Sequence, residues 1–147
     1  MSTGPYLLAA LICERVITEN DGVLSIVRII DRLAHSLTEP NVVMSPITYP
    51  LTYLIILKSG TARGTYQVSI NVENPAGLIT VGPSMTILLE GEDRGQNIIM
   101  KTAMTFNSDG LYWFLVMLDD QEITRIPFRV MYLRSSGFGL GVQQKEV

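Results

Sequence analysis

Apolar and polar residues alternate with a period of two over much of this sequence, and this alternation is what most constrains its fold. Between residues 65 and 72, tyrosine, valine, isoleucine and valine alternate with threonine, glutamine, serine and asparagine. A strand with one buried face and one face in water has this pattern. The Asn-Pro-Ala-Gly sequence at residues 74–77 then predicts a turn. We therefore expect a half-buried β-strand followed by a tight connection.

Other segments rich in β-branched and aromatic residues are separated by turn signals. The Asp21-Gly22 pair is a strong hairpin signal because it lies between two such segments. Turns or loops are also predicted at residues 58–64, 82–83, 91–96 and 119–122, which contain Gly or Asp. The sequence predicts further strands at residues 5–18, 23–33, 51–57, 78–81, 85–89, 98–106, 111–118 and 123–133.

Residues 23–37 also fit a helix, because their apolar positions recur at nearly helical spacing. Two features favour a strand. An Asp-Gly pair begins a hairpin better than it begins a helix, and β-branched residues favour strands. These β-branched residues are Val23, Ile26, Val27, Ile29 and Ile30.

Many short strands without a long helix predict an all-β protein, a single Ig-like antiparallel β-sandwich of about seven to nine strands. A chain of 147 residues is long enough for one domain with its own core. Tyr112, which follows Ser108 and an Asp-Gly pair, resembles the tyrosine corner of such sandwiches. We assign residues 1–134 to the sandwich and residues 135–147 to a flexible tail, whose alternating apolar residues also allow an added edge strand.

Composition restricts the compartment and the partners. The chain is 47% hydrophobic with a net charge of −3, so it is expected to fold. Its 11 Lys and Arg residues are scattered, which argues against nucleic acid. It has no run of the roughly 18 apolar residues that span a membrane. Cys13 is the only cysteine, and no cation precedes the apolar residues 6–12 as in a signal peptide. We expect a cytoplasmic protein.

The sequence offers little for catalysis or metal binding. His35 is the only histidine, and it lies near no recognised Ser or Cys motif. Cys13 lies within an apolar strand, where we expect it to fill the core. No Cys and His residues cluster as in a zinc site. We predict no enzyme activity, no cofactor and no metal, with one alternative: the acidic loop of Glu90, Glu92 and Asp93, expected to be solvated, has the oxygen ligands of a Ca²⁺ site.

Two surfaces are candidates for binding. Arg28, Asp31, Arg32 and His35 are predicted to form a polar group late in the second strand, with Glu14 opposite Arg28 across the hairpin. The simpler interpretation is that these are exposed side chains that pair across neighbouring strands and bind nothing. The alternative is a small-ligand-binding or enzymatic pocket.

The strand at residues 111–118 is apolar on both faces, whereas the outer face of a sandwich is usually polar. We therefore predict that its outer face contacts either more of the same chain or a partner. The partner is expected to be another protein or a second copy of this chain. The predicted interface residues are Leu111, Trp113, Leu115 and Met117.

Three segments carry a resemblance to a known family: residues 11–16 (LICERV), 21–26 (DGVLSI) and 29–32 (IIDR). A Gly-x-Tyr strand from Gly64 that ends in a Pro-x-Gly turn at Gly77 completes the pattern. The chain resembles a family of short, uncharacterised bacterial and phage-associated proteins, mainly over its first 80 or so residues. The resemblance implies an Ig-like sandwich and no assigned activity or functional residue.

We expect the protein to be a non-enzymatic interaction or structural module. A ligand-binding or enzymatic sandwich with a polar pocket near Arg28, Arg32 and His35 is the first alternative. A phage accessory or virion-decoration protein is the second.

Overall fold

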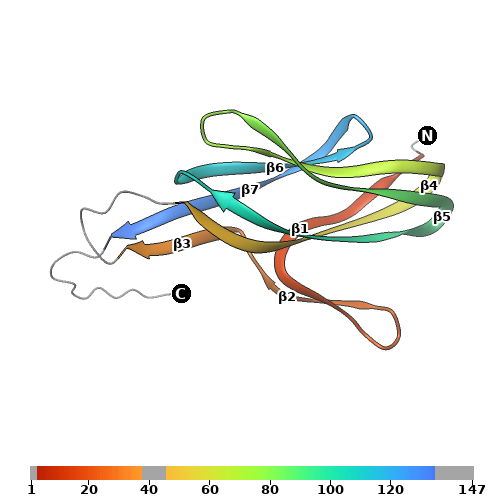
Figure 1. Ribbon diagram of the computed structural model, residues 1–147. Coiled ribbons are helices and arrows are strands. Elements are labelled where there is room, and N and C mark those ends of the chain that lie inside the picture. The colour runs from red at the N-terminus through yellow and green to blue at the C-terminus, as the bar shows by residue number, and fades with distance from the viewer. Residues whose placement is uncertain (1–2, 38–45, 135–147) are drawn as a thin grey trace.

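The structure is a computed structural model that describes residues 3–37 and 46–134 (Figure 1). These residues form strands and turns and contain no helix, so the choice of strand over helix for residues 23–37 is correct. The predicted tail, residues 135–147, lies outside the described residues. The seven strands are β1 (Tyr6–Thr18), β2 (Leu24–Ile29), β3 (Arg32–Leu37), β4 (Ile47–Glu73), β5 (Ile79–Phe106), β6 (Gly110–Leu118) and β7 (Gln121–Arg134).

The two longest strands, β4 and β5, bend and so belong to both layers of a sandwich. The first half of β4 pairs with β1 and with the second half of β5. The second half of β4 pairs with the first half of β5 and with β6. The first layer therefore has the order β2-β1-β4-β5, and the second layer has the order β5-β4-β6-β7-β3. Figure 1 shows β4 and β5 curving round together at one end of the molecule.

The turn predicted at residues 58–64 and the loop predicted at residues 91–96 are wrong, because both segments are bends within continuous strands. Gly60 and Gly91 have φ angles of 61° and 94°, in the left-handed region that favours glycine. The pairing register between β4 and β5 shifts on both sides of Gly60. Glycines at these places make bulges that turn a strand into the other layer without ending it. The break predicted at residues 82–83 is also only a register shift, opposite Ser69 and Asn71.

The single strand predicted at residues 23–33 is also wrong, because the chain changes layers within it. β2 pairs with β1 as the Asp-Gly hairpin predicts, with Leu24 opposite Thr18. Arg28 then has a φ angle of 61°, and the buried Ile30 donates its N–H to the carbonyl of Ile12 at 2.8 Å. The chain next crosses to the second layer, where β3 pairs with β7 in parallel. This pair is the exception in an otherwise antiparallel sandwich.

The core lies between the inner faces of the two layers and contains a chain of aromatic rings. Tyr53 of the first layer lies 5.7 Å from Phe114 of β6, measured between ring centroids. Phe114 lies 5.6 Å from Phe128, which stacks on Phe106 at 5.6 Å. Phe106 in turn lies 5.0 Å from Tyr112. All five rings are buried, so one continuous aromatic chain crosses the core.

The tyrosine corner predicted at Tyr112 is present. The Tyr112 hydroxyl donates a hydrogen bond to the Ser108 carbonyl at 2.7 Å and accepts one from the Ser108 N–H at 3.3 Å. This contact fixes the connection before β6 in the manner of Ig-type sandwiches. Together with the two-layer strand order, it defines the fold as an Ig-like β-sandwich, as the sequence predicts.

Candidate functional site

The outer face of β6 presents the four residues that the sequence predicts as an interface. Alternate residues of β6 belong to the core, so Leu111, Trp113, Leu115 and Met117 point to the other side of the second layer. Leu115 is buried, and the other three are half-buried. The structure therefore brings these four side chains, the β6 stripe, onto one face.

Polar side chains from the neighbouring strands partly cover the β6 stripe. Trp113 lies between Glu73 on β4 and Pro127 on β7. The guanidinium carbon of Arg125 lies 5.7 Å from the centroid of the Trp113 ring, which is a cation–π distance. Arg125 is held there by Glu122 at 2.6 Å and Glu73 at 3.9 Å. The hydrogen bond from Arg125 lowers the pKa of the Glu122 carboxyl.

The most exposed apolar side chains beside this face lie beyond β4, where β5 begins. Leu78, Ile79 and Val81 are 66%, 57% and 78% exposed. We call these three residues the apolar edge. Ile79 lies opposite Glu73, which lies opposite Trp113, so Ile79 and Trp113 occupy one cross-strand row. We did not predict the apolar edge from the sequence, although the apolar residues directly after the turn at residues 74–77 could have indicated it.

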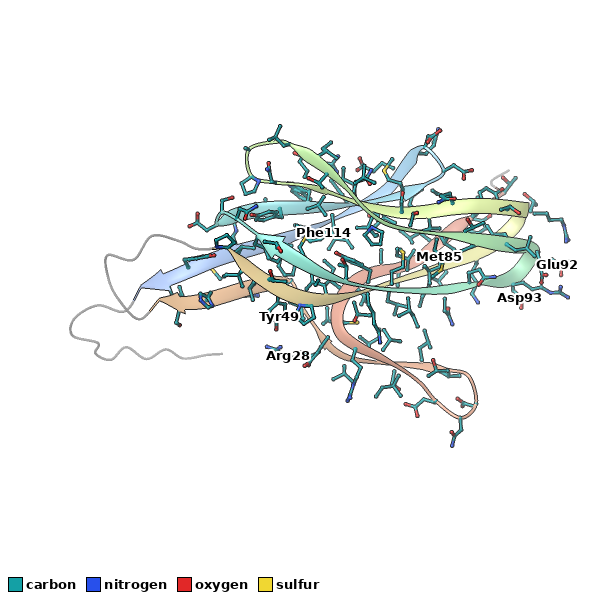
Figure 2. The ribbon with its side chains drawn as sticks, in the orientation of Figure 1. Arg28, Tyr49, Met85, Glu92, Asp93 and Phe114 are labelled. Atoms are coloured by element: carbon teal, nitrogen blue, oxygen red, sulfur yellow. The ribbon has the colours of Figure 1, made fainter. Side chains whose placement is uncertain are left out.

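The structure does not gather the predicted polar group into one site. Arg28 lies on β2 in the first layer, where its side chain points away from the body of the protein (Figure 2). Asp31 and Arg32 form an exposed ion pair at 2.9 Å, and the Arg32 hydrogen bond lowers the pKa of Asp31. His35 lies on β3, with its ring 5.7 Å from that of Tyr132. These residues line none of the four best-formed cavities in the described part of the chain.

Glu14 and Arg28, predicted to lie opposite one another across the hairpin, form no ion pair within the residues that the structure describes. The ladder between β1 and β2 places the two positions opposite one another, between the pairs Cys13–Ile29 and Arg15–Val27. The left-handed backbone of Arg28 interrupts the regular ladder at this point and redirects its side chain.

The acidic residues of the predicted loop lie on the outside of the bend in β5. Glu92 and Asp93 are exposed at one end of the molecule (Figure 2). Arg63 donates to the Glu90 carbonyl at 2.6 Å, and Arg94 pairs with the Glu90 carboxylate at 3.5 Å. Within residues 3–37 and 46–134, no three His, Cys, Asp or Glu side chains are grouped to hold a metal ion.

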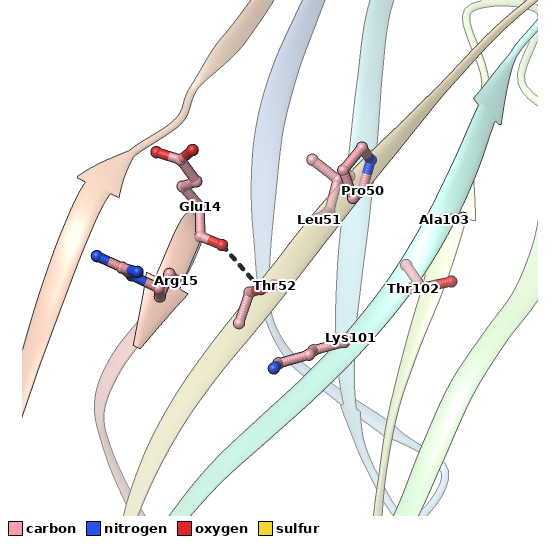
Figure 3. A pocket seen from close by; sticks show the side chains of 8 residues that line it. All are labelled: Glu14, Arg15, Pro50, Leu51, Thr52, Lys101, Thr102 and Ala103. Carbon is pink, nitrogen blue, oxygen red and sulfur yellow. Dashed lines mark hydrogen bonds between the residues drawn. The ribbon is translucent and has the colours of Figure 1, made fainter. Parts of the chain in front are cut away.

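An open groove of about 440 Å³ lies where β1 separates from β4 (Figure 3). The two strands pair as far as Cys13 and Thr52, after which β1 continues only with β2. Thr52 donates its hydroxyl hydrogen to the Glu14 carbonyl at 3.2 Å. Arg15 and Lys101 also line this groove, so its walls carry charges. Cys13 is fully buried beside it, and burial raises the pKa of its thiol, which makes it a poor nucleophile.

A second cavity, of about 310 Å³, opens between the two halves of β5, and we call it the Tyr53 cleft. Each half of β5 pairs only with β4 among the described strands, so the interior is reached between their free edges. Tyr53 and Val72 are the buried residues of the lining. Thr80 and Thr102 lie opposite the core residues Val72 and Leu51, so their side chains are on the inner faces of the two layers.

The fold and these surfaces define the protein as an Ig-like sandwich without a recognisable catalytic centre in its described residues. The chain belongs to the family of unknown function DUF6941, which it matches over residues 8–131. No curated protein matches the sequence. The described residues contain no helix long and apolar enough to cross a membrane.

Similar solved structures are distant in sequence. A β-glucosidase from Listeria innocua in complex with glucose superposes with a TM-score of 0.52 at 8% identity. That match covers 71% of this chain but only 15% of the β-glucosidase, so it supports the fold alone. The CARDB domain of a Pyrococcus furiosus protein, in complex with di-metal ions, has a TM-score of 0.46 and 11% identity. It covers 89% of this chain and 94% of the other.

Proposed function

We propose that the protein is a non-enzymatic interaction module that associates with a second copy of itself. The contact surface is the outer face of the second layer, with Trp113 near its centre and the apolar edge along its margin. The observation that carries the proposal is the exposure of Leu78, Ile79 and Val81, three large apolar side chains within four residues. Exposed apolar groups on an edge strand are typical of contact surfaces.

The chemistry around Trp113 suits a contact surface of this kind. Trp and Arg are the residues most enriched at the energetic centres of interfaces, and Arg125 lies against the Trp113 ring. The ion pairs of Arg125 with Glu122 and Glu73 supply polar groups beside the apolar ones. A role without catalysis is supported by the burial of Cys13 and by the exposure of His35 away from a cavity.

The experiment is to measure molar mass by size-exclusion chromatography with light scattering over a range of concentrations. We expect the wild-type protein to form a dimer or larger oligomer. Ile79→Glu and Trp113→Glu should shift it to monomer, because each places a charge on the proposed contact. Val23→Glu is the matched control, since Val23 is 62% exposed but lies at the β1–β2 hairpin. A wild-type protein that is monomeric at every concentration, or an equal effect of Val23→Glu, overturns the proposal.

The alternative of a ligand pocket at Arg28, Arg32 and His35 is not favoured, because these residues lie on strands in different layers. Bacterial or phage origin, cytoplasmic location, and a role as a phage accessory or virion-decoration protein stay predictions from the sequence. The resemblance described above supports the origin and the phage-related role, and the single cysteine and the residues before the apolar segment 6–12 support the location.

A further inference from the structure

Tyr53 has a buried hydroxyl group with no hydrogen-bond partner. The side chain is 1% exposed, and its Oη atom makes no hydrogen bond to a protein group. Burial raises the pKa of this phenol above its usual range, so it is neutral at physiological pH. A buried polar atom that lacks a partner costs about 1–3 kcal/mol, and native proteins contain few of them. This hydroxyl therefore requires an explanation.

The position of Tyr53 supplies one, because Tyr53 is the most deeply buried of the residues that line the Tyr53 cleft. The volume of about 310 Å³ is many times the roughly 30 Å³ that one water occupies, and it lies at the lower end of small-molecule sites. The cavity has room for a molecule much larger than a single bridging water.

The chemistry of the cleft indicates what that molecule is like. No charged side chain lines it, in contrast to the groove between Arg15 and Lys101. Val72 and Met104 give it apolar surface, and Thr80 and Thr102 place hydroxyl groups on opposite walls. A charged ligand would lose its hydration here without gaining an ionic partner. A neutral molecule with an apolar body and one polar head matches both kinds of surface.

We propose that the Tyr53 cleft is a binding site for a small uncharged molecule that carries a carbonyl or amide group. The Tyr53 hydroxyl donates its hydrogen bond to the carbonyl oxygen, and the threonine hydroxyl groups accept from the amide N–H. The apolar body of the ligand packs between the two halves of β5. This site shares Val81 with the margin of the proposed contact surface, but it does not include any residue of the β6 stripe.

The test is an NMR titration of the folded protein with three probes of nearly equal size: benzamide, benzoate and benzylamine. We expect benzamide to shift the backbone amide signals of Thr80, Gly82 and Asn107, which line the cleft but not the groove at Arg15 and Lys101. Benzoate and benzylamine, which are charged at neutral pH, should leave these signals unchanged. The proposal is overturned if benzamide shifts none of these signals, or if the charged probes bind equally well.

Two variants examine the role assigned to the hydroxyl groups. Tyr53→Phe keeps the ring and should weaken benzamide binding about tenfold, the effect of one buried hydrogen bond. Thr102→Val tests the opposite wall without altering the aromatic chain, and it should weaken binding several-fold. Tyr49→Phe, on the same strand but outside the cavity lining, is the control and should bind as the wild type does. Equal binding by Tyr53→Phe and the control overturns the proposal.

Discussion

Two buried tyrosines stand at opposite ends of the aromatic chain, and they differ in what their hydroxyl groups do. Tyr112 makes its hydrogen bonds to Ser108, four residues earlier in the same chain. Tyr53 has no partner for its hydroxyl, although its ring packs on Phe114. The two rings are similarly buried, so burial alone does not explain the difference. Both tyrosines line cavities, so the difference is in the partners within reach: the Ser108 backbone lies beside the Tyr112 hydroxyl, and no protein group bonds to the Tyr53 hydroxyl.

The Tyr112 hydroxyl therefore stabilises the fold through a hydrogen bond, whereas the Tyr53 hydroxyl has no protein partner and can bond to a ligand. The Tyr112 hydrogen bond stabilises the connection between β5 and β6, and it needs no partner from outside the chain. The Tyr53 hydroxyl adds nothing to the packing that a phenylalanine would not provide. Substitutions that remove first a central ring of the aromatic chain and then each tyrosine hydroxyl test this difference.

The largest effect is expected from Phe114→Ala, which removes the ring that contacts both Tyr53 and Phe128. Phe114 is fully buried, and truncations of this kind leave a cavity that costs about 3–5 kcal/mol. The free energy of unfolding should fall by this amount in urea denaturation. Phe114→Leu is the control, and its loss should be smaller because more of the volume is retained. A loss below about 1 kcal/mol for Phe114→Ala would show that the aromatic chain is not the core of the domain.

The next largest effect is expected from Tyr112→Phe. This change leaves the Ser108 carbonyl without its donor, which should lower the free energy of unfolding by about 1–3 kcal/mol. Ser108→Ala is the matched control, because the short bond is made to the backbone and survives this substitution. If both variants lose the same stability, the serine side chain and not the tyrosine corner holds the connection.

Tyr53→Phe should have the opposite sign. In the absence of ligand, removing an unpaired buried hydroxyl should leave stability unchanged or raise it by about 1 kcal/mol. The same urea titration, performed beside that of Tyr112→Phe, measures the difference between the two tyrosines. A loss as large as that of Tyr112→Phe would contradict the comparison, because it would mean that the Tyr53 hydroxyl is already satisfied.

The sequence could predict one of these tyrosines but not the other. Tyr112 is recognisable because its partner is four residues away and an Asp-Gly pair lies between them. The cleft at Tyr53 lies between the two halves of β5, which reach different layers because β4 and β5 bend together at Gly60 and Gly91. In the sequence these glycines look like turns, because positive φ serves a turn and a bulge equally well. Alternation predicted the sandwich, but it did not predict which strands continue from one layer to the other.

The candidate binding surfaces also differ in whether the sequence could predict them. The β6 stripe follows from strand periodicity, so its four residues could be predicted to share one face. The group around Arg28 and His35 depended on one uninterrupted strand, and the left-handed backbone at Arg28 interrupts it. The shielding of Trp113 by Arg125 joins residues of two strands through register, which the period of either strand alone does not reveal.

The smallest effect is expected on the outer face of β6, at the ion pair of Glu122 and Arg125. Like the Tyr112 hydroxyl, these two charged groups find their partners within the chain. The hydrogen bond from Arg125 lowers the pKa of Glu122 below its ordinary value of 4.5. Its contribution to stability is therefore present above that value and is lost as pH falls through the lower folded pKa. Since both groups are exposed, we expect the main signal from Trp113 and not from stability. Its fluorescence should change on acidification as Arg125 is released, and Glu122→Gln should remove this transition. A transition of unchanged size in Glu122→Gln would show that another group controls the Trp113 environment.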